Sequence, residues 1–156
     1  MAYNSFSEPY KALGYVNDWK EAFVRSGKLD VDLCNICDLV SFRKYKKKIK
    51  DYSLIIVLHS ALGDHCKLLL KTSHWFHKKT GKLVAFVGNE YDLLDEKINF
   101  LNEAGADFVC SQLPRNASRF LYGNNKNISI IDMPHALNEK VYRSSENKNY
   151  EKKVSF

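Results

Sequence analysis

Short apolar runs alternate with helix-patterned stretches along this chain of 156 residues. Residues 54–58 and 83–87 are apolar at every position, which is typical of strands buried on both faces. Such strands need helices packed above and below them, and alternation of strand and helix implies right-handed crossovers between parallel strands. The pattern therefore predicts the α/β class, as a three-layer domain with a mostly parallel sheet.

The apolar spacing also sets the expected elements. The predicted strands cover residues 29–36, 53–59, 83–88, 107–112 and 128–133, and the predicted helices cover residues 8–26, 41–50, 64–80, 94–104 and 114–122. Pro9 suits the first turn of the first helix, and Gly27 suits its end. No strand is predicted ahead of that helix, although a doubly wound domain usually opens with one.

The composition changes toward the C-terminus. Residues 1–142 hold all of the predicted elements and are enough for one domain with its own core. Residues 143–153 are polar and charged, as in a linker, and an apolar run starts at residue 154. We therefore expect residues 143–156 to be a linker and the start of a second domain.

The chain is basic, with a formal net charge of +6, and much of the excess lies in residues 43–50. A basic surface favours anionic partners: nucleic acid, anionic lipid headgroups or phosphorylated substrates. A solvated helix face explains the same charges. Since no run of about 18 apolar residues and no apolar signal core occurs, we expect a cytoplasmic protein.

The cysteines and histidines do not form a recognisable metal or redox motif. Cys34 and Cys37 are three apart in a predicted strand, so their thiols are expected on opposite faces. His74 and His77 share a helix face, but Asp64 lies more than about 10 Å away along that helix. No metal and no cofactor are expected.

Polar residues follow each of the later predicted strands. In a parallel sheet these residues meet at one edge, just outside the carboxyl ends of the strands, where ligands bind. The candidate site residues are His59, Ser60, Asp64, Asn89, Glu90, Tyr91, Gln112 and His135.

These side chains suit the recognition of hydroxyl groups. A neutral imidazole at His59 can take a proton from a hydroxyl. Asn89 and Glu90 can bond sugar hydroxyls, while the ring of Tyr91 can stack on the apolar face of a sugar. Ordinary local roles stay open, because Asp64 equally suits a helix N-cap and residues 88–92 equally suit a polar turn.

Several segments together resemble a known family. They are residues 51–57, 88–91, 104–114, 134–138 and 152–156, in this order, with an early helix that carries Tyr10, Tyr15, Trp19 and Phe23. This series resembles the N-terminal half of GT-B glycosyltransferases, in particular the group-1 and spore-maturation-type families.

The resemblance implies a Rossmann-like domain that is one half of a GT-B architecture. In that family the N-terminal domain mainly binds the acceptor, the C-terminal domain binds the nucleotide-sugar donor, and catalysis is typically metal-independent. The implied activity is transfer of a glycosyl group, of the hexosyltransferase type, to an acceptor hydroxyl, with residues 1–142 inactive alone. His59 would be catalytic, and Ser60, Asp64, Asn89, Glu90, Tyr91, Gln112 and His135 would bind the acceptor or sugar.

The implied partners are a sugar or lipid-linked acceptor and the C-terminal GT-B domain. The basic helix at residues 42–50 would rest on the anionic inner face of a membrane, and no nucleic acid is expected. The alternative is a non-enzymatic basic Rossmann-like module that binds nucleic acid or a protein partner. It predicts salt-sensitive binding through residues 43–50, but it gives no reason for polar residues after the strands.

Overall fold

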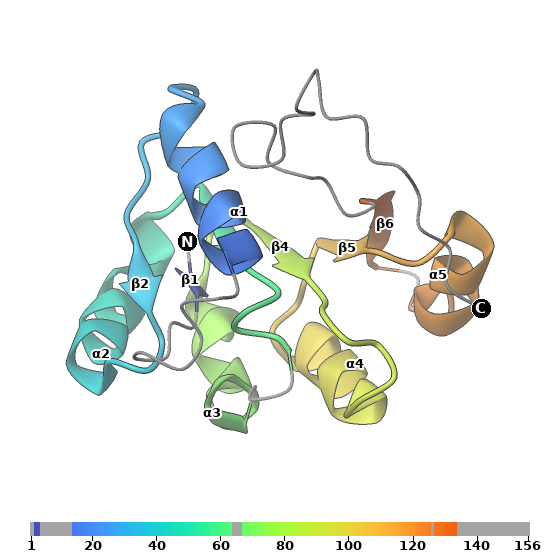
Figure 1. Ribbon diagram of the computed structural model, residues 1–156. Helices are drawn as coiled ribbons and strands as arrows, with labels where there is room; N and C mark the ends of the chain where they lie inside the picture. Colours follow the sequence, from blue (N-terminus) through green and yellow to red (C-terminus); the bar gives the residue numbers. More distant parts are fainter. Residues whose placement is uncertain (1, 4–13, 64–66, 126, 134–156) are drawn as a thin grey trace, which may run out of the picture.

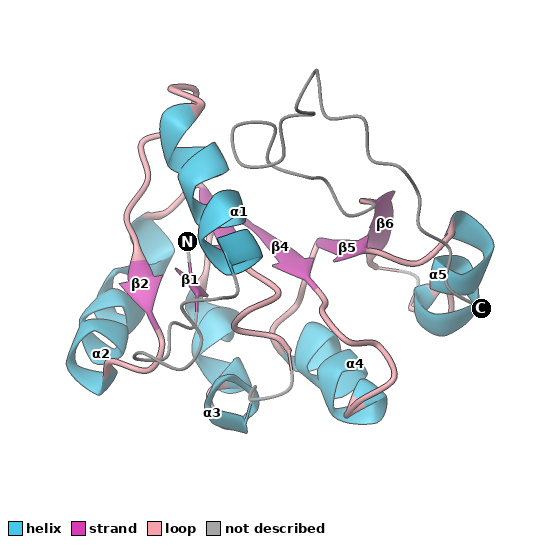
Figure 2. Cartoon of the chain, in the orientation of Figure 1, coloured by secondary structure: helices cyan, strands magenta, loops and turns pink. Residues whose placement is uncertain are grey.

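A computed structural model describes residues 2–3, 14–63, 67–125 and 127–133 of the chain. In this part of the chain, helices surround one sheet, as Figures 1 and 2 show. The elements are β1 (Ala2–Tyr3), α1 (Gly14–Arg25), β2 (Cys34–Asn35), α2 (Leu39–Lys48), η1 (Ile49–Asp51), β3 (Leu54–Val57), α3 (Lys67–Lys71), η2 (Ser73–Lys78), β4 (Lys82–Phe86), α4 (Leu94–Glu103), β5 (Phe108–Ser111), α5 (Arg115–Tyr122) and β6 (Ser129–Asp132), where η marks a 3₁₀-helix.

The sheet has six strands in the order β2-β1-β3-β4-β5-β6, and each neighbouring pair is parallel. The longest register joins β3 to β4, from Leu54 opposite Lys82 to Val57 opposite Ala85. The strand order reverses between β1 and β3, since the chain goes to β2 on one side before it returns to the other. Such a reversal is the usual place for a ligand in an open α/β sheet.

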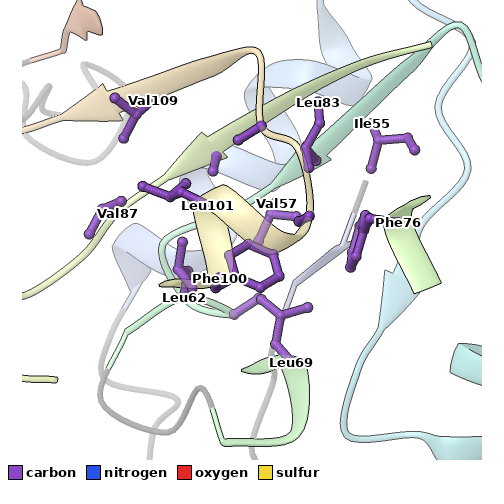
Figure 3. Packing of buried hydrophobic residues seen from close by; sticks show 14 of the residues in the cluster. Ile55, Val57, Leu62, Leu69, Phe76, Leu83, Val87, Phe100, Leu101 and Val109 are labelled. Carbon is purple, nitrogen blue, oxygen red and sulfur yellow. The ribbon is translucent and has the colours of Figure 1, made fainter. Parts of the chain in front are cut away.

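One face of the sheet carries the larger core. Because side chains alternate along a strand, Ile55 and Val57 of β3 point to the same face as Leu83 of β4. Figure 3 shows these side chains packed with others from the helices, among them Leu69, Phe76, Phe100 and Leu101. Each large apolar side chain that is fully buried contributes roughly 1.5–3 kcal/mol to stability, so this face is the main source of folding energy.

The opposite face is covered by α1. Trp19 and Phe23 of this helix pack against Ile56, Leu58 and Phe86. The rings of Trp19 and Phe86 lie 5.3 Å apart, centroid to centroid, in an edge arrangement. Figure 1 shows α1 on one side of the sheet and α2, α3 and α4 on the other, as expected for three layers. None of the described helices has the length and apolarity that a membrane crossing requires.

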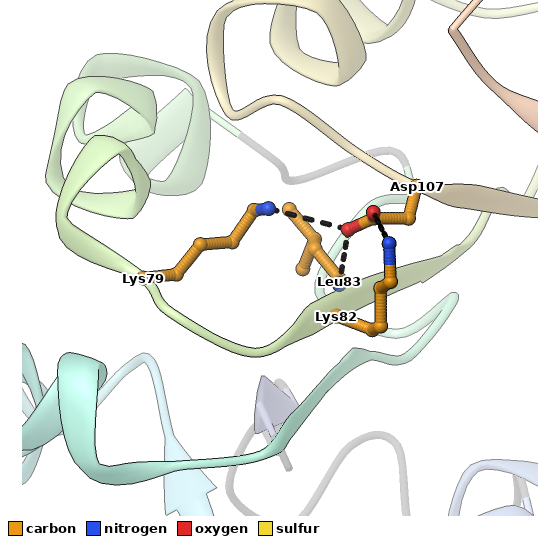
Figure 4. A network of polar contacts seen from close by, with 4 residues as sticks. All are labelled: Lys79, Lys82, Leu83 and Asp107. Atoms are coloured by element: carbon orange, nitrogen blue, oxygen red, sulfur yellow. Dashed lines mark hydrogen bonds and ion pairs between the residues drawn. The ribbon is translucent and has the colours of Figure 1, made fainter.

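A partly exposed ion-pair network joins the amino ends of β4 and β5. Asp107 accepts hydrogen bonds from Lys79 Nζ at 3.2 Å, Lys82 Nζ at 2.7 Å and the backbone N–H of Leu83 at 2.9 Å (Figure 4). Burial alone would raise the pKa of Asp107, but these donors outweigh it and hold the pKa at about 2. The carboxylate therefore fixes where β5 starts relative to β4.

The α/β class, the parallel sheet and most of the later elements are confirmed, and three details of the prediction are wrong. An opening strand exists, because Ala2–Tyr3 pairs with both β2 and β3. The predicted strand at residues 29–36 is only Cys34–Asn35; Asp30 and Asp32, which are poor strand formers, stand in the part that is not a strand.

The third detail is the helix predicted at residues 64–80, which is interrupted at Thr72. The Thr72 hydroxyl donates to the carbonyl oxygens of Leu68 and Leu69, both at 3.0 Å, and so competes for helical acceptors. The backbone N–H of Thr72 bonds Leu69 three residues back, and the chain continues as the 3₁₀-helix η2. The first predicted helix is described from Gly14 onward, while its first part and the predicted linker at residues 143–156 lie outside the described residues.

Candidate functional site

The carboxyl ends of β3, β4 and β5 lie at one edge of the sheet because the strands are parallel. His59 and Ser60 follow β3, Asn89 and Glu90 follow β4, and Gln112 follows β5. Since β3 is next to the reversal of strand order, His59 and Ser60 lie where ligands bind in open α/β sheets. We call this set of loops the carboxyl edge.

The loops after β3 and β4 are in direct contact. A Cβ atom added to Gly88 would lie 3.2 Å from the Cβ of His59, and one added to Gly63 would lie 2.9 Å from the carbonyl oxygen of His59. The N–H of Gly88 also donates to the carbonyl of Leu62 at 3.4 Å. Gly88 therefore permits the close approach that brings His59 next to the start of the β4–α4 loop, while Gly63 permits a tight turn within the loop after β3.

His59 lies beneath α1. Its side chain is 6% exposed, and its ring meets the edge of Trp19 with a centroid distance of 6.5 Å and an interplanar angle of 72°. The Trp19 ring is itself packed on Phe86, so its position is fixed by the core. The imidazole thus packs against α1, the helix that joins β1 to β2.

Glu90 is also buried, and it is bonded to the neighbouring strand. Ser111 Oγ donates to Glu90 Oε1 at 2.8 Å and accepts from the N–H of Leu113 at 3.1 Å. The pKa of Tyr122, a residue of α5, is raised. Burial is the main cause, and the charge of Glu90 is the second. Glu90, Ser111 and the Tyr122 phenol thus form a buried polar cluster below the carboxyl edge.

Lys97 holds the β4–α4 loop from below. The side chain is fully buried, and Nζ donates to the carbonyl oxygens of Gly88 at 2.8 Å and Asn89 at 2.9 Å. Asn89 has a φ of 50°, a left-handed conformation that asparagine tolerates better than most residues. Leu93 has the same φ of 50°, which costs a leucine on the order of 1–2 kcal/mol. The loop is therefore held in a specific shape by groups that do not reach the surface.

The groups that do reach solvent come from the same loops. Tyr91 is 87% exposed, while Ser60, Asn89 and Gln112 are half-buried. They offer a hydroxyl, two amides and a phenol ring, which can bond and stack on a polyhydroxylated ligand. At the carboxyl edge, the Glu90 carboxyl group and the His59 imidazole are thus buried, and neutral polar groups lie nearer to solvent.

Six of the eight predicted site residues fall within the described part of the chain. His59, Ser60, Asn89, Glu90, Tyr91 and Gln112 come from loops at the same edge. Asp64 and His135 lie outside the described residues. In the part of the chain that the structure describes, no group of three His, Cys, Asp or Glu residues is placed to hold a metal ion.

The sequence prediction missed three residues that shape this site: Lys97, Ser111 and Trp19. A signal for Lys97 was present, because it falls on the apolar stripe of its helix with Leu94 and Leu101. Ser111 comes directly before Gln112 at the end of a strand. No local pattern relates Trp19 to His59, since their contact depends on tertiary packing.

The two cysteines do not share a strand as predicted, because β2 ends at Asn35 and Cys37 lies in the turn that follows. Cys34 is buried and Cys37 is exposed. Burial raises the pKa of both thiols, that of Cys34 to about 11, so neither is poised as a thiolate. Cys110, behind the carboxyl edge, has its pKa raised to about 11 by the same cause.

No protein-family model matches the chain, and comparisons with curated proteins and with solved structures found no match either. The resemblance to GT-B glycosyltransferases is therefore a prediction from the sequence.

Proposed function

We propose that the chain is the acceptor-side domain of a nucleotide-sugar-dependent glycosyltransferase of the GT-B type. The main support for the proposal is that three strand-end loops lie at one edge of the sheet, and that the first of them, with His59 and Ser60, lies next to the reversal of strand order. Ligands of open α/β sheets bind at this place, and the polar groups found there suit hydroxyl-rich molecules.

In this proposal the acceptor sugar lies on the exposed groups. Tyr91 stacks on its apolar face, and Ser60, Asn89 and Gln112 bond its hydroxyls. The buried contacts of Lys97 with Gly88 and Asn89 keep the binding loop in shape before the sugar arrives. Preorganisation of this kind lowers the ordering cost of binding.

His59 acts as the base or orients the acceptor hydroxyl. During transfer, the acceptor oxygen forms a bond to the anomeric carbon of the donor sugar. The bond from that carbon to the nucleoside diphosphate breaks, and the acceptor proton passes to the base. A second domain holds the donor, so residues 1–142 alone bind acceptors and do not transfer sugar.

Saturation-transfer NMR with methyl glycosides tests this proposal. Tyr91→Ala should weaken glycoside binding by roughly two- to twelvefold, because an aromatic contact is worth about 0.5–1.5 kcal/mol. Phe120→Ala is the matched control, since Phe120 is an equally exposed aromatic residue on α5, 83% exposed. Glycoside binding that is absent, or that both substitutions change equally, would contradict the proposal.

A further inference from the structure

Cationic side chains gather around a hollow at the opposite end of the sheet from the carboxyl edge. The hollow has a volume of about 490 Å³, and α2, η1 and η2 form its walls. We call it the cationic groove; its lining residues are Arg43, Lys46, Lys47, Ile49, Lys50, Trp75 and Lys78. Lys50 and Lys78 come shortly before β3 and β4, and the Thr80 hydroxyl ties their segments together by donating to the Lys50 carbonyl at 2.6 Å. The groove therefore belongs to the amino edge and is separate from the candidate sugar site.

Favourable interaction with the helix dipole explains only some of the cations that line the groove. Lys46 and Lys47 lie in the last turn of α2, where cations interact favourably with the helix dipole. Arg43 lies in the middle of the helix, and Lys78 comes from a different element. Arg43 and Lys47 are like charges four residues apart in α2, which is destabilising in a helix.

The described residues do not neutralise the groove. No aspartate or glutamate lines it, and its five cations form no ion pair within the described part of the chain. Mutual repulsion of these charges is relieved when an anion enters. The arrangement is thus unfavourable without a ligand and favourable with one.

The groove also has a rigid wall. Trp75 packs on Phe42 with ring centroids 4.9 Å apart, and Lys46 Nζ lies 4.1 Å from the centre of the Trp75 ring. A cation in that position is attracted to the face of the ring, and both residues line the hollow. One of the five cations is therefore positioned before any ligand binds.

We infer that the cationic groove binds a soluble small molecule that carries two or more phosphate groups. Phosphate oxygens match the fork of Arg43 and the point charges of the lysines. The hollow is concave and falls within the volume range of small-molecule sites, about 300–1,000 Å³. A concave site of this size favours a compact polyanion over a flat membrane surface or a long nucleic acid.

Calorimetric titration of the chain with sodium tripolyphosphate tests this inference. Lys47→Gln with Lys50→Gln removes two charges from the groove, whereas Lys44→Gln with Lys48→Gln removes two charges of α2 that lie outside the groove. All four lysines are exposed, so both double variants should fold, which circular dichroism can verify. The groove variant should bind at least about tenfold more weakly, because two charge-assisted contacts are lost, and the control variant should change less than about threefold.

Equal weakening in both double variants would overturn the inference, because it would indicate diffuse attraction by net charge. Two further probes separate the sources of phosphate: vesicles of phosphatidylcholine with phosphatidylserine, and a single-stranded oligonucleotide. Binding of either probe without binding of tripolyphosphate would also overturn it. Lys78→Gln should weaken tripolyphosphate binding as well, since Lys78 reaches the groove from η2 independently of α2.

Discussion

Lys97 is a charged residue in a fully buried position, which proteins rarely permit without paired partners. Its two bonds go to carbonyl oxygens in the loop that carries Asn89, Glu90 and Tyr91. The lysine therefore stabilises the loop of the candidate site more directly than it stabilises the core.

We predict that Lys97→Met lowers the free energy of unfolding by about 1–3 kcal/mol. Methionine fills a similar volume, but it leaves the Gly88 and Asn89 carbonyls without their donor, and buried acceptors that lose a partner carry that cost. Urea denaturation measures the change.

Lys82→Met is the control, because the Lys82 side chain is 67% exposed and its ion pair with Asp107 is a surface interaction. Its loss should cost less than about 1 kcal/mol. A Lys97→Met protein as stable as the parent chain would show that the buried ammonium does not fix the loop.

Individual site residues could be predicted from the sequence only in part. The positions of Asn89 and Glu90 follow from the end of an apolar strand. The burial of Glu90 does not, because it results from Ser111 of a neighbouring strand. His59 was likewise predicted at a strand end, while its cover by Trp19 comes from a helix far away in the sequence.

At the scale of elements, the apolar pattern was most informative where strands are buried on both faces. Residues 53–59 and 83–88 were predicted as strands, and β3 and β4 fall within or close to these ranges. Prediction failed where polar side chains decide the local structure. Thr72 breaks a helix that its apolar neighbours favour, because its hydroxyl takes up helical carbonyl groups.

Asp107 offers a pH test of how β4 and β5 are joined. Its pKa of about 2 in the folded chain is below the ordinary value of 3.8. A lowered carboxyl pKa contributes stability that is present above about pH 4 and is lost as pH falls toward 2. We predict that the parent chain exceeds Asp107→Asn in stability by about 1–2 kcal/mol at neutral pH.

The difference between the two proteins should shrink between pH 4 and pH 2, as urea denaturation at a series of pH values can show. A constant difference over this range would mean that the carboxylate charge contributes nothing to the joint.

At the scale of the whole molecule, parallel threading was predicted from the alternation of strands and helices, and the structure has it. The place of reversal was not predicted. It depends on β1, whose two residues, Ala2–Tyr3, are too short for any periodic pattern. His59 therefore follows the strand next to the reversal of strand order, which is where ligands bind in open α/β sheets.

The two ends of the sheet differ in chemistry. Neutral polar groups and a buried acid lie at the carboxyl edge, while the cationic groove lies toward the amino ends of β3 and β4. A sugar and a polyphosphate would thus bind at different places, and the failure of one proposal would leave the other standing.

Amide shifts in ¹⁵N-resolved NMR, followed while a methyl glycoside is added, test the central proposal most directly. We expect the shifts to concentrate at Ser60, Asn89, Tyr91 and Gln112, in the loops after three different strands. Ser53 and Gly81, at the amino edge, should not move. Shifts confined to the amino edge or to the cationic groove, or no shifts at saturating glycoside, would contradict a sugar site at the carboxyl edge.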